Sequence, residues 1–195
     1  SGGRWQIAVL PGSRDREVEN IWPLQLDIIR KLAARHPGTR FHLACLRDRH
    51  CRWCRQQLTE QDAQLDIQFF VGRTSEILHT ADCALVKSGS VSLEVMARGT
   101  PAVVIYHATR TLYTIGKSLV NIPYISLPNL MANREVIPEF IAVGANCRTS
   151  VEAATAAMDQ LMSDPGLRQA KRMELQQLSS QYGQTGASHN AAKCI

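Results

Sequence analysis

Short apolar runs alternate with amphipathic segments along this chain, and the alternation constrains its fold more than any other feature. Apolar runs of about four to eight residues are typical of buried strands, whereas apolar residues three and four positions apart are typical of helices. The pattern predicts strands at residues 6–10, 40–46, 67–71, 83–86, 102–106 and 124–127. It predicts helices at 18–36, 47–61, 74–80, 90–98, 112–120, 151–163 and 165–182. We therefore expect an α/β fold: a doubly wound, Rossmann-like parallel sheet of about six strands with helices on both faces and extra C-terminal helices.

No internal repeat or low-complexity linker interrupts this alternation. We expect a single domain over residues 1–195, in which 183–195 form a frayed tail because they are small and polar. The chain begins with Ser1-Gly2-Gly3 instead of Met, which indicates a trimmed linker and a longer parent protein.

The composition narrows the class of ligand. The chain has 22 Lys and Arg against 17 Asp and Glu, a net charge of +5 that suits a phosphorylated ligand or an anionic membrane surface. No nucleic-acid-binding motif is present, and no apolar run approaches the roughly 18–20 residues of a membrane span. The 6 cysteines are scattered, several of them inside apolar runs, and no secretory signal precedes them. We therefore expect reduced thiols and a cytoplasmic protein.

The first expected strand runs into Pro11-Gly12-Ser13-Arg14, and a helix follows. Gly12 allows a tight turn, and the unpaired N–H groups and positive dipole end of a helix favour an anion. The planar guanidinium of Arg14 suits a phosphate or diphosphate. An ordinary strand-to-helix turn with a surface arginine is the alternative interpretation.

A second motif, Ser88-Gly89-Ser90, follows the fourth expected strand, and Glu94 lies one turn into the next helix. The backbone N–H groups and hydroxyls of this loop would all donate to a phosphate, and Glu94 would accept from paired hydroxyls such as those of a ribose. The alternative is a capped helix in which Glu94 reaches back to its own N-terminus.

A third motif, Ser126-Leu127-Pro128-Asn129-Leu130, offers an amide donor and acceptor at the end of an expected strand, although a turn-forming Asn would look the same. Loops that follow parallel strands share one edge of the sheet. The three motifs together therefore predict a site for a nucleotide with a diphosphate.

Two other patterns have simpler interpretations. Cys51 and Cys54 form a Cys-x-x-Cys near Cys45, but no second pair or spaced histidines complete a zinc site, so we expect no metal. The arginines at 47, 49, 52 and 55 would suit anionic lipid headgroups or, more simply, form a solvated helix face.

Taken together, the motifs resemble the carboxyl-terminal half of the lipid-A-disaccharide synthase family over residues 4–182. The segment 126–130 with its following Arg-Glu is rather specific to that family. The Ser-Gly pair with Glu94 is shared by many glycosyltransferases of the two-Rossmann-domain class, GT-B. The segments that carry the resemblance are 10–14 with Glu17, 88–90 with Glu94, 99–104 with Tyr106, and 126–130 with Arg134-Glu135 and Pro138-Glu139.

The resemblance implies an inverting, metal-independent transfer without a cofactor. Diacylglucosamine would move from UDP-2,3-diacylglucosamine to 2,3-diacylglucosamine 1-phosphate, which gives UDP and a β-1,6-linked disaccharide. In such enzymes the carboxyl-terminal domain holds the UDP-sugar, while the amino-terminal domain supplies much of the acceptor site and the general base. We therefore expect this chain to bind the donor, to lack the amino-terminal domain and to be inactive alone. It would work in the cytoplasm, at the inner-membrane surface.

The resemblance also implies roles for individual residues. Arg14 would stabilise the leaving diphosphate and Asn129 would contact the donor sugar or diphosphate, so these two are the expected catalytic residues. Glu94 would hold the ribose. Phosphate or nucleoside contacts would come from Gly12, Ser13, Ser88, Gly89 and Ser90, and the backbone at Gly72 would border the uracil.

This chain departs from the family pattern at two positions. Lys87 stands where a small residue is usual, and Ala142 stands near a usual Gln. Other classes remain open from the residues alone, namely another enzyme that uses UDP-N-acetylglucosamine, such as an epimerase or a peptidoglycan glycosyltransferase, or a non-catalytic nucleotide-binding module. A dinucleotide-dependent oxidoreductase is disfavoured because no Gly-x-Gly-x-x-Gly follows the first strand.

Overall fold

Six parallel strands form one sheet in the computed structural model, which describes residues 4–109, 124–144 and 147–182. The strand order is β3-β2-β1-β4-β5-β6, and every neighbouring pair is parallel. The chain therefore reverses its direction of winding between β1 and β4, where doubly wound sheets bind their ligands. The strands are β1 (Gln6–Leu10), β2 (Arg40–Cys45), β3 (Asp66–Val71), β4 (Cys83–Lys87), β5 (Ala102–Ala108) and β6 (Glu139–Val143).

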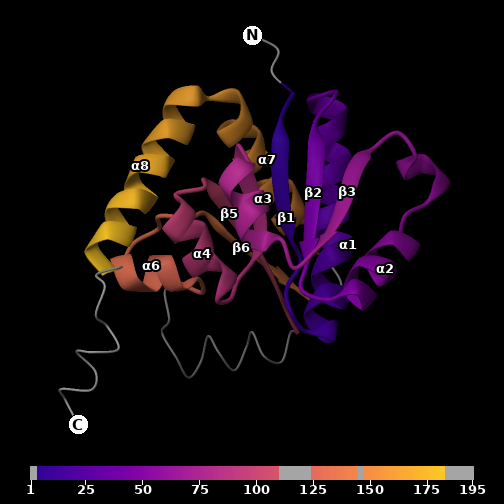
Figure 1. Cartoon of the computed structure of the whole chain (residues 1–195), viewed down its shortest axis with the longest axis horizontal. Coiled ribbons are helices and arrows are strands. Elements are labelled where there is room, and N and C mark those ends of the chain that lie inside the picture. Colours follow the sequence, from indigo (N-terminus) through magenta and orange to yellow (C-terminus); the bar gives the residue numbers. More distant parts are fainter. Residues whose placement is uncertain (1–3, 110–123, 145–146, 183–195) are drawn as a thin grey trace.

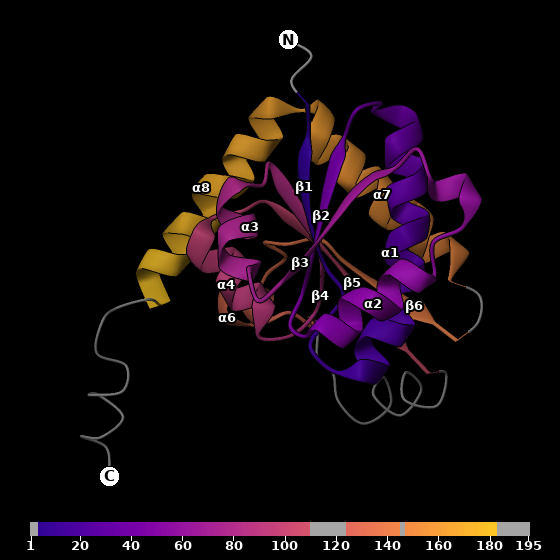
Figure 2. The ribbon, with the colours of Figure 1, turned by 45° about the vertical axis from the view of Figure 1, so that its right-hand side comes forward.

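Helices cover both faces of the sheet, as Figures 1 and 2 show. One face carries α1 (Asp15–Arg35), α2 (Asp48–Gln56) and α7 (Arg148–Ser163). The other carries α3 (Thr74–Thr80), α4 (Val91–Arg98), α6 (Leu127–Ala132) and α8 (Pro165–Tyr182). The predicted fold class is confirmed.

Each central strand contributes to two apolar cores. In β1, Ile7 and Val9 face the core under α1 and α7, whereas Ala8 and Leu10 face the core under α4 and α8. All four are buried, because a parallel sheet covered on both faces has no solvent side. Because both faces of the central strands are buried, these strands are continuous apolar runs in the sequence.

The sixth strand is not where the sequence placed it. Residues 124–126 form no strand, and α6 begins at Leu127. The N–H groups of Ile125 and Ser126 donate to the carboxylate of Glu139, over 2.7 Å each, instead of to a neighbouring strand. Pro128 lies in the first turn of α6, where its missing N–H costs nothing. The sixth strand is β6, which pairs with β5 at one edge of the sheet.

Helix bounds also differ from those expected. The second helix ends at Gln56, residues 57–59 are not helical, and a short 3-10 turn (Glu60–Asp62) follows them. The first helix begins at Asp15, three residues before its apolar face starts. The predicted helix at 112–120 and the predicted tail at 183–195 lie outside the described residues. None of the helices in the described ranges is both long and apolar enough to span a bilayer.

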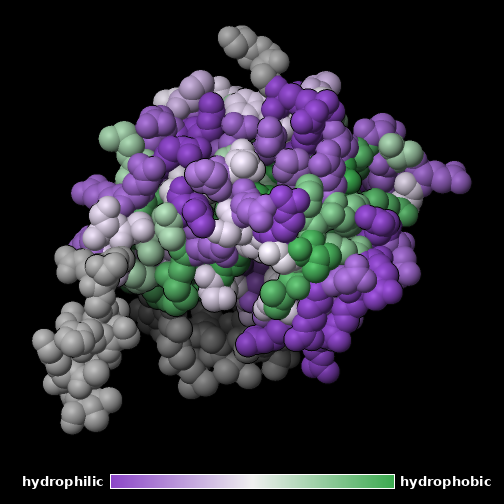
Figure 3. Space-filling model, viewed as in Figure 1, coloured by the Kyte–Doolittle hydropathy of each residue, from purple (hydrophilic) through white to green (hydrophobic). Residues whose placement is uncertain are grey.

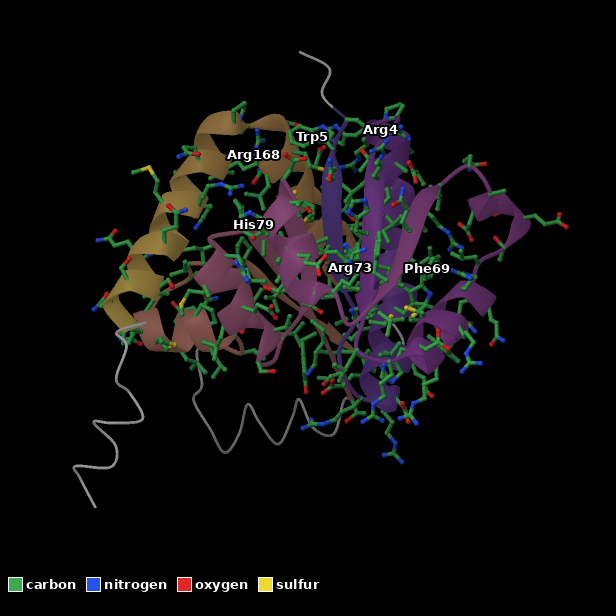
Figure 4. The ribbon with its side chains drawn as sticks, in the orientation of Figure 1. Arg4, Trp5, Phe69, Arg73, His79 and Arg168 are labelled. Carbon is green, nitrogen blue, oxygen red and sulfur yellow. The ribbon has the colours of Figure 1, made fainter. Side chains whose placement is uncertain are left out.

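The amino ends of the strands carry a separate set of polar contacts. Arg168 of α8 stacks over the ring of Trp5 at 4.7 Å, close to the start of β1 (Figure 4). A cavity of about 490 Å³ also lies at this end, lined in part by Arg4, Arg30 and Asp66. The predicted nucleotide site is at the opposite end of the sheet, so this cavity is not part of it.

Candidate functional site

The loop between β1 and α1 forms the expected turn, and a carboxylate of the chain itself fills it. Gly12 has φ +121°, and a Cβ at this position would lie 2.9 Å from the Cβ of Glu17. The N–H groups of Ser13 and Arg14 donate to Glu17 Oε2 over 3.1 and 3.3 Å. These are the N–H groups that would meet a phosphate. In this structure Glu17 caps these N–H groups at the start of α1, and their predicted contact with a phosphate stays a prediction.

The side chain of Arg14 is far more exposed than that of Glu17. Its side chain is 83% exposed and makes one long contact of 3.3 Å with Glu17 Oε1. A guanidinium that is this exposed needs little rearrangement to meet a ligand at the carboxyl edge of the sheet.

Lys87, at the end of β4, joins the two predicted phosphate loops. Its ammonium donates to Glu17 Oε1 over 2.9 Å. It also lies 3.5 Å from the position that a Cβ on Gly89 would take, and 5.7 Å from the centre of the Tyr106 ring. The side chains of Lys87 and Glu17 are only 14% and 18% exposed. A half-buried ion pair thus crosses the point where the sheet reverses its winding.

The pKa of Glu17 reflects these contacts. Burial by itself raises the pKa of this carboxyl. The hydrogen bonds from Lys87 and from the N–H groups of Ser13 and Arg14, with the charge of Lys87, outweigh burial and bring the pKa below its ordinary value. Glu17 is therefore an anion at neutral pH.

The Ser88–Ser90 loop leads into α4 as expected. Ser88 is buried, and its hydroxyl donates to the carbonyl of Ile125 over 3.1 Å. Ser90 is exposed, and Ser92 donates to the carbonyl of Gly89 over 2.6 Å. Glu94 is half-buried in the first turn of α4, and across residues 4–109, 124–144 and 147–182 no hydrogen bond or ion pair engages its carboxylate. The capping-box interpretation of Glu94 is therefore wrong, while its predicted contact with a ribose stays a prediction.

Asn129 lies in α6 and not at the end of a strand. It is fully buried, and its amide nitrogen donates to the carbonyl of Ile137 and to Glu139 Oε1 over 2.7 and 2.8 Å. Its amide oxygen accepts from the N–H groups of Val136 and Ile137 over 2.8 and 2.9 Å. All the hydrogen-bonding capacity of the side chain is used inside the protein in this structure. Its predicted contact with a donor sugar stays a prediction.

Glu139 connects this segment to the second loop, a role the sequence did not predict. Its carboxylate accepts from the backbone of Ile125 and Ser126 and from Asn129. The carbonyl of Ile125 in turn accepts from Ser88. The three-residue spacing of Arg14 and Glu17 was a signal for the capping carboxylate. Glu139 was marked only as part of the family resemblance, and its contacts were not predictable locally because its partners lie ten or more residues away.

Gly72 follows β3 at the same edge, two strands from β1. It has φ +69°, is exposed, and donates its N–H to the carbonyl of Cys45 over 3.0 Å. Val71, which precedes Gly72, and Leu46, which follows its hydrogen-bond partner Cys45, both have exposed apolar side chains. Figure 3 shows an apolar area along β3 next to the hydrophilic surface of α2.

The cysteines and arginines of the two remaining patterns lie in and around β2 and α2. Cys45, Cys51 and Cys54 are buried free thiols, and no group of three potential metal ligands occurs there. On the basic side of α2, Arg49 pairs with Asp15 at the start of α1 and Arg52 pairs with Asp48 within α2, and both arginine side chains stay more than half exposed. His50 also contacts Asp15, over 2.7 Å, and fastens α2 to the start of α1.

Comparison with known proteins identifies the family of this chain. A sequence model of the lipid-A-disaccharide synthetase family matches residues 4–195. The chain belongs to the lipid-A-disaccharide synthase family. The resemblance drawn from the motifs is thereby confirmed.

Curated relatives carry the same name. The lipid-A-disaccharide synthase of Syntrophus aciditrophicus (strain SB) is 32% identical over 186 residues, which cover 95% of this chain and 47% of the relative. That of Pseudomonas aeruginosa (strain UCBPP-PA14) is 35% identical over 158 residues, which cover 81% of this chain and 40% of the relative. The chain thus spans about half the length of the lipid-A-disaccharide synthases that it matches.

Solved structures support the fold. The spinosyn rhamnosyltransferase SpnG, complexed with thymidine diphosphate, matches 92% of this chain and 42% of its own, with a TM-score of 0.57 and 14% identity. The pneumococcal O-GlcNAc transferase GtfA, in complex with UDP and GlcNAc, matches 93% of this chain and 34% of its own, with a TM-score of 0.56 and 14% identity. The fold is that of one Rossmann-like domain of a GT-B glycosyltransferase.

Proposed function

We propose that this chain is the donor-binding half of an inverting glycosyltransferase of lipid A synthesis. The donor is UDP-2,3-diacylglucosamine, the acceptor is 2,3-diacylglucosamine 1-phosphate, and the products are the β-1,6-linked disaccharide 1-phosphate and UDP. Membership of the lipid-A-disaccharide synthase family supports this reaction over that of another enzyme using UDP-N-acetylglucosamine. The chain spans about half of its relatives, so the acceptor site and general base are assigned to an amino-terminal domain.

The observation that carries the proposal is the convergence of two loops at the reversal point of the sheet. The loop at Gly12–Arg14 follows β1 and the loop at Ser88–Ser90 follows β4, its neighbour in the sheet. Lys87 bridges the two loops through Glu17, and the exposed Arg14 makes only a 3.3 Å contact with Glu17 beside them. Backbone N–H groups, hydroxyls and two cations suit a nucleoside diphosphate at this edge.

Each proposed residue has a task in the transfer. A base of the other domain removes the proton from the acceptor hydroxyl, the oxygen attacks the anomeric carbon, and the bond to the diphosphate breaks. Arg14 meets the negative charge that grows on the leaving UDP, which is where a fixed cation lowers the barrier most. Glu94 accepts from the ribose hydroxyls, and the backbone at Gly72 borders the uracil.

The role proposed for Asn129 differs from the contact with the donor sugar or diphosphate that its motif suggests. Its amide holds Glu139, which holds residues 125–126, which accept from Ser88. We assign Asn129 to the positioning of the Ser88–Ser90 loop in this conformation, and a direct contact with the sugar would need its internal hydrogen bonds to open.

Calorimetric titration of the 195-residue chain with UDP, ADP and NAD tests the proposal. We expect UDP to bind more tightly than ADP and NAD. Tight binding of NAD with no response to UDP would overturn it.

The location at the cytoplasmic face of the inner membrane is part of the same proposal, since both substrates carry acyl chains. Co-sedimentation of the chain with anionic vesicles tests that part separately.

A further inference from the structure

Lys87 is the cation of this edge to which neither the motifs nor the steps of the proposed reaction assign a task. It stands immediately before the Ser88–Ser90 loop, and its ammonium lies between that loop and the Gly12–Arg14 loop. An ammonium has three N–H donors, and within residues 4–109, 124–144 and 147–182 one acceptor is present, Glu17 Oε1. A half-buried cation with donors to spare between two phosphate loops is placed to bind an anion.

Glu17 occupies the position that such an anion would take. It accepts from the same N–H groups, of Ser13 and Arg14, that open the α1 helix. It also neutralises Lys87 and lies near Arg14. A diphosphate brought next to this carboxylate would be repelled by it, because both are anions in a half-buried place.

Displacement of the carboxylate removes that repulsion at small cost. When Glu17 leaves, a phosphate oxygen can accept from the Ser13 and Arg14 N–H groups in its place, so the start of α1 stays capped. The ammonium of Lys87 then changes partners from the carboxylate to the phosphate without moving between loops. The side chain of Glu17 is 18% exposed, so part of it already contacts solvent.

We propose that Lys87 binds the diphosphate of the donor and that Glu17 is a resident counter-ion which the diphosphate displaces. The proposal rests on the proposed function, because it needs a nucleoside diphosphate at this edge. It assigns to Lys87 a charge-assisted contact in the bound state, and to Glu17 an unfavourable effect on affinity.

The ratio of UDP affinity to uridine affinity tests this proposal. Both ligands share the nucleoside, and loss of folded protein would lower both affinities equally, so the ratio isolates the diphosphate contacts. Lys87→Met keeps the length of the side chain without its charge, and we expect it to lower the ratio about tenfold or more. Lys31→Met, which removes the same charge further along α1, is the control and should leave the ratio unchanged.

The Glu17→Gln variant distinguishes two roles for Glu17. The diphosphate either displaces its carboxylate, or the carboxylate only holds Lys87 in position for the ligand. A glutamine at the third helical position still makes a capping box, so the helix start is kept. We expect the ratio to rise several-fold, because a neutral amide repels no phosphate and holds the N–H groups and the ammonium less strongly. Glu19→Gln, an exposed change in the same helix, should have no effect.

Each measured result tests one part of the proposal. An unchanged ratio in Lys87→Met overturns the role of the lysine. An unchanged or lower ratio in Glu17→Gln overturns the displacement of the carboxylate, since a purely supporting Glu17 predicts a loss. Absence of UDP binding by the unaltered chain overturns the proposed function itself, which is distinguishable because it precedes any comparison of variants.

Discussion

Asn129 donates a hydrogen bond of 2.8 Å to the carboxylate of Glu139, and this contact ties α6 to the start of β6. The same carboxylate holds the backbone at Ile125 and Ser126, and the carbonyl of Ile125 accepts from Ser88. Two motifs that are far apart in the sequence thus form one hydrogen-bonded unit at the edge of the site. The amide is part of the frame that holds the second loop in place.

Replacement of Asn129 by Ala should therefore destabilise the protein as well as impair the site. The change leaves two backbone N–H groups and a carbonyl without their partner in a fully buried place, which costs at least about 2 kcal/mol of unfolding free energy. Urea denaturation followed by circular dichroism measures this loss. Leu130→Ala, an exposed change in the same helix, is the matched control and should cost much less. Equal stabilities of Asn129→Ala and the unaltered chain would contradict the structural role.

Arg14→Ala should weaken UDP far more than uridine. The exposed guanidinium is proposed to meet the diphosphate, and a hydrogen bond to a charged group contributes about 1.5–3 kcal/mol, or about 10- to 100-fold in affinity. Because the side chain is 83% exposed, the fold should not change. Titration calorimetry with both ligands checks the prediction, with Arg52→Ala on α2 as the control. Equal losses for the two ligands would show that Arg14 does not meet the diphosphate.

Asp62 should give the protein an acid-sensitive component of stability. The hydrogen bond from Arg30 is the largest cause that holds the pKa of Asp62 well below its ordinary value of 3.8, and Thr59 adds to it. A carboxyl with a depressed folded-state pKa stabilises the protein above its unfolded pKa and loses this contribution as the pH falls. We expect Asp62→Asn to reduce stability at pH 7, and the difference from the unaltered chain to shrink below about pH 4.

Chemical denaturation of both proteins across this pH range measures that difference. Asp66→Asn is a useful comparison, because Asp66 also contacts arginines, Arg4 and Arg40, but at a more exposed position. A difference that stays constant down to pH 2 would contradict the assignment.

The buried thiols should be inert in the native state. Burial is the main cause that raises the pKa of Cys51 and of Cys83, to about 12 each. At pH 8 both groups are therefore thiols, whereas the thiolate is the reactive form. We expect iodoacetamide to leave Cys51 and Cys83 unmodified in the native chain and to label them in urea, as mapped by mass spectrometry. Rapid native labelling of Cys51 would instead revive a redox role for the Cys51–Cys54 pair.

The pattern of apolar residues in the sequence was sufficient to predict most strands of the sheet. The runs at 6–10, 83–86 and 102–106 lie within β1, β4 and β5, because strands buried on both faces must be apolar throughout. It failed at 124–127, where an apolar run before a proline looks like a strand. The backbone of that run bonds instead to a carboxylate that is 13 and 14 residues further along the chain. No local rule anticipates such a partner.

The sequence by itself determined the class of fold, the family and the edge at which the Gly12–Arg14 and Ser88–Ser90 loops meet. The fold class and this edge follow from periodicity and turn chemistry, which are local, and the family follows from the resemblance of the motifs. Only the tertiary structure decided that Glu17 fills the first loop, that Lys87 bridges to it from β4, and that Asn129 is turned inward onto Glu139. These are contacts between elements, and the sheet order that brings β1 beside β4 is what makes them possible.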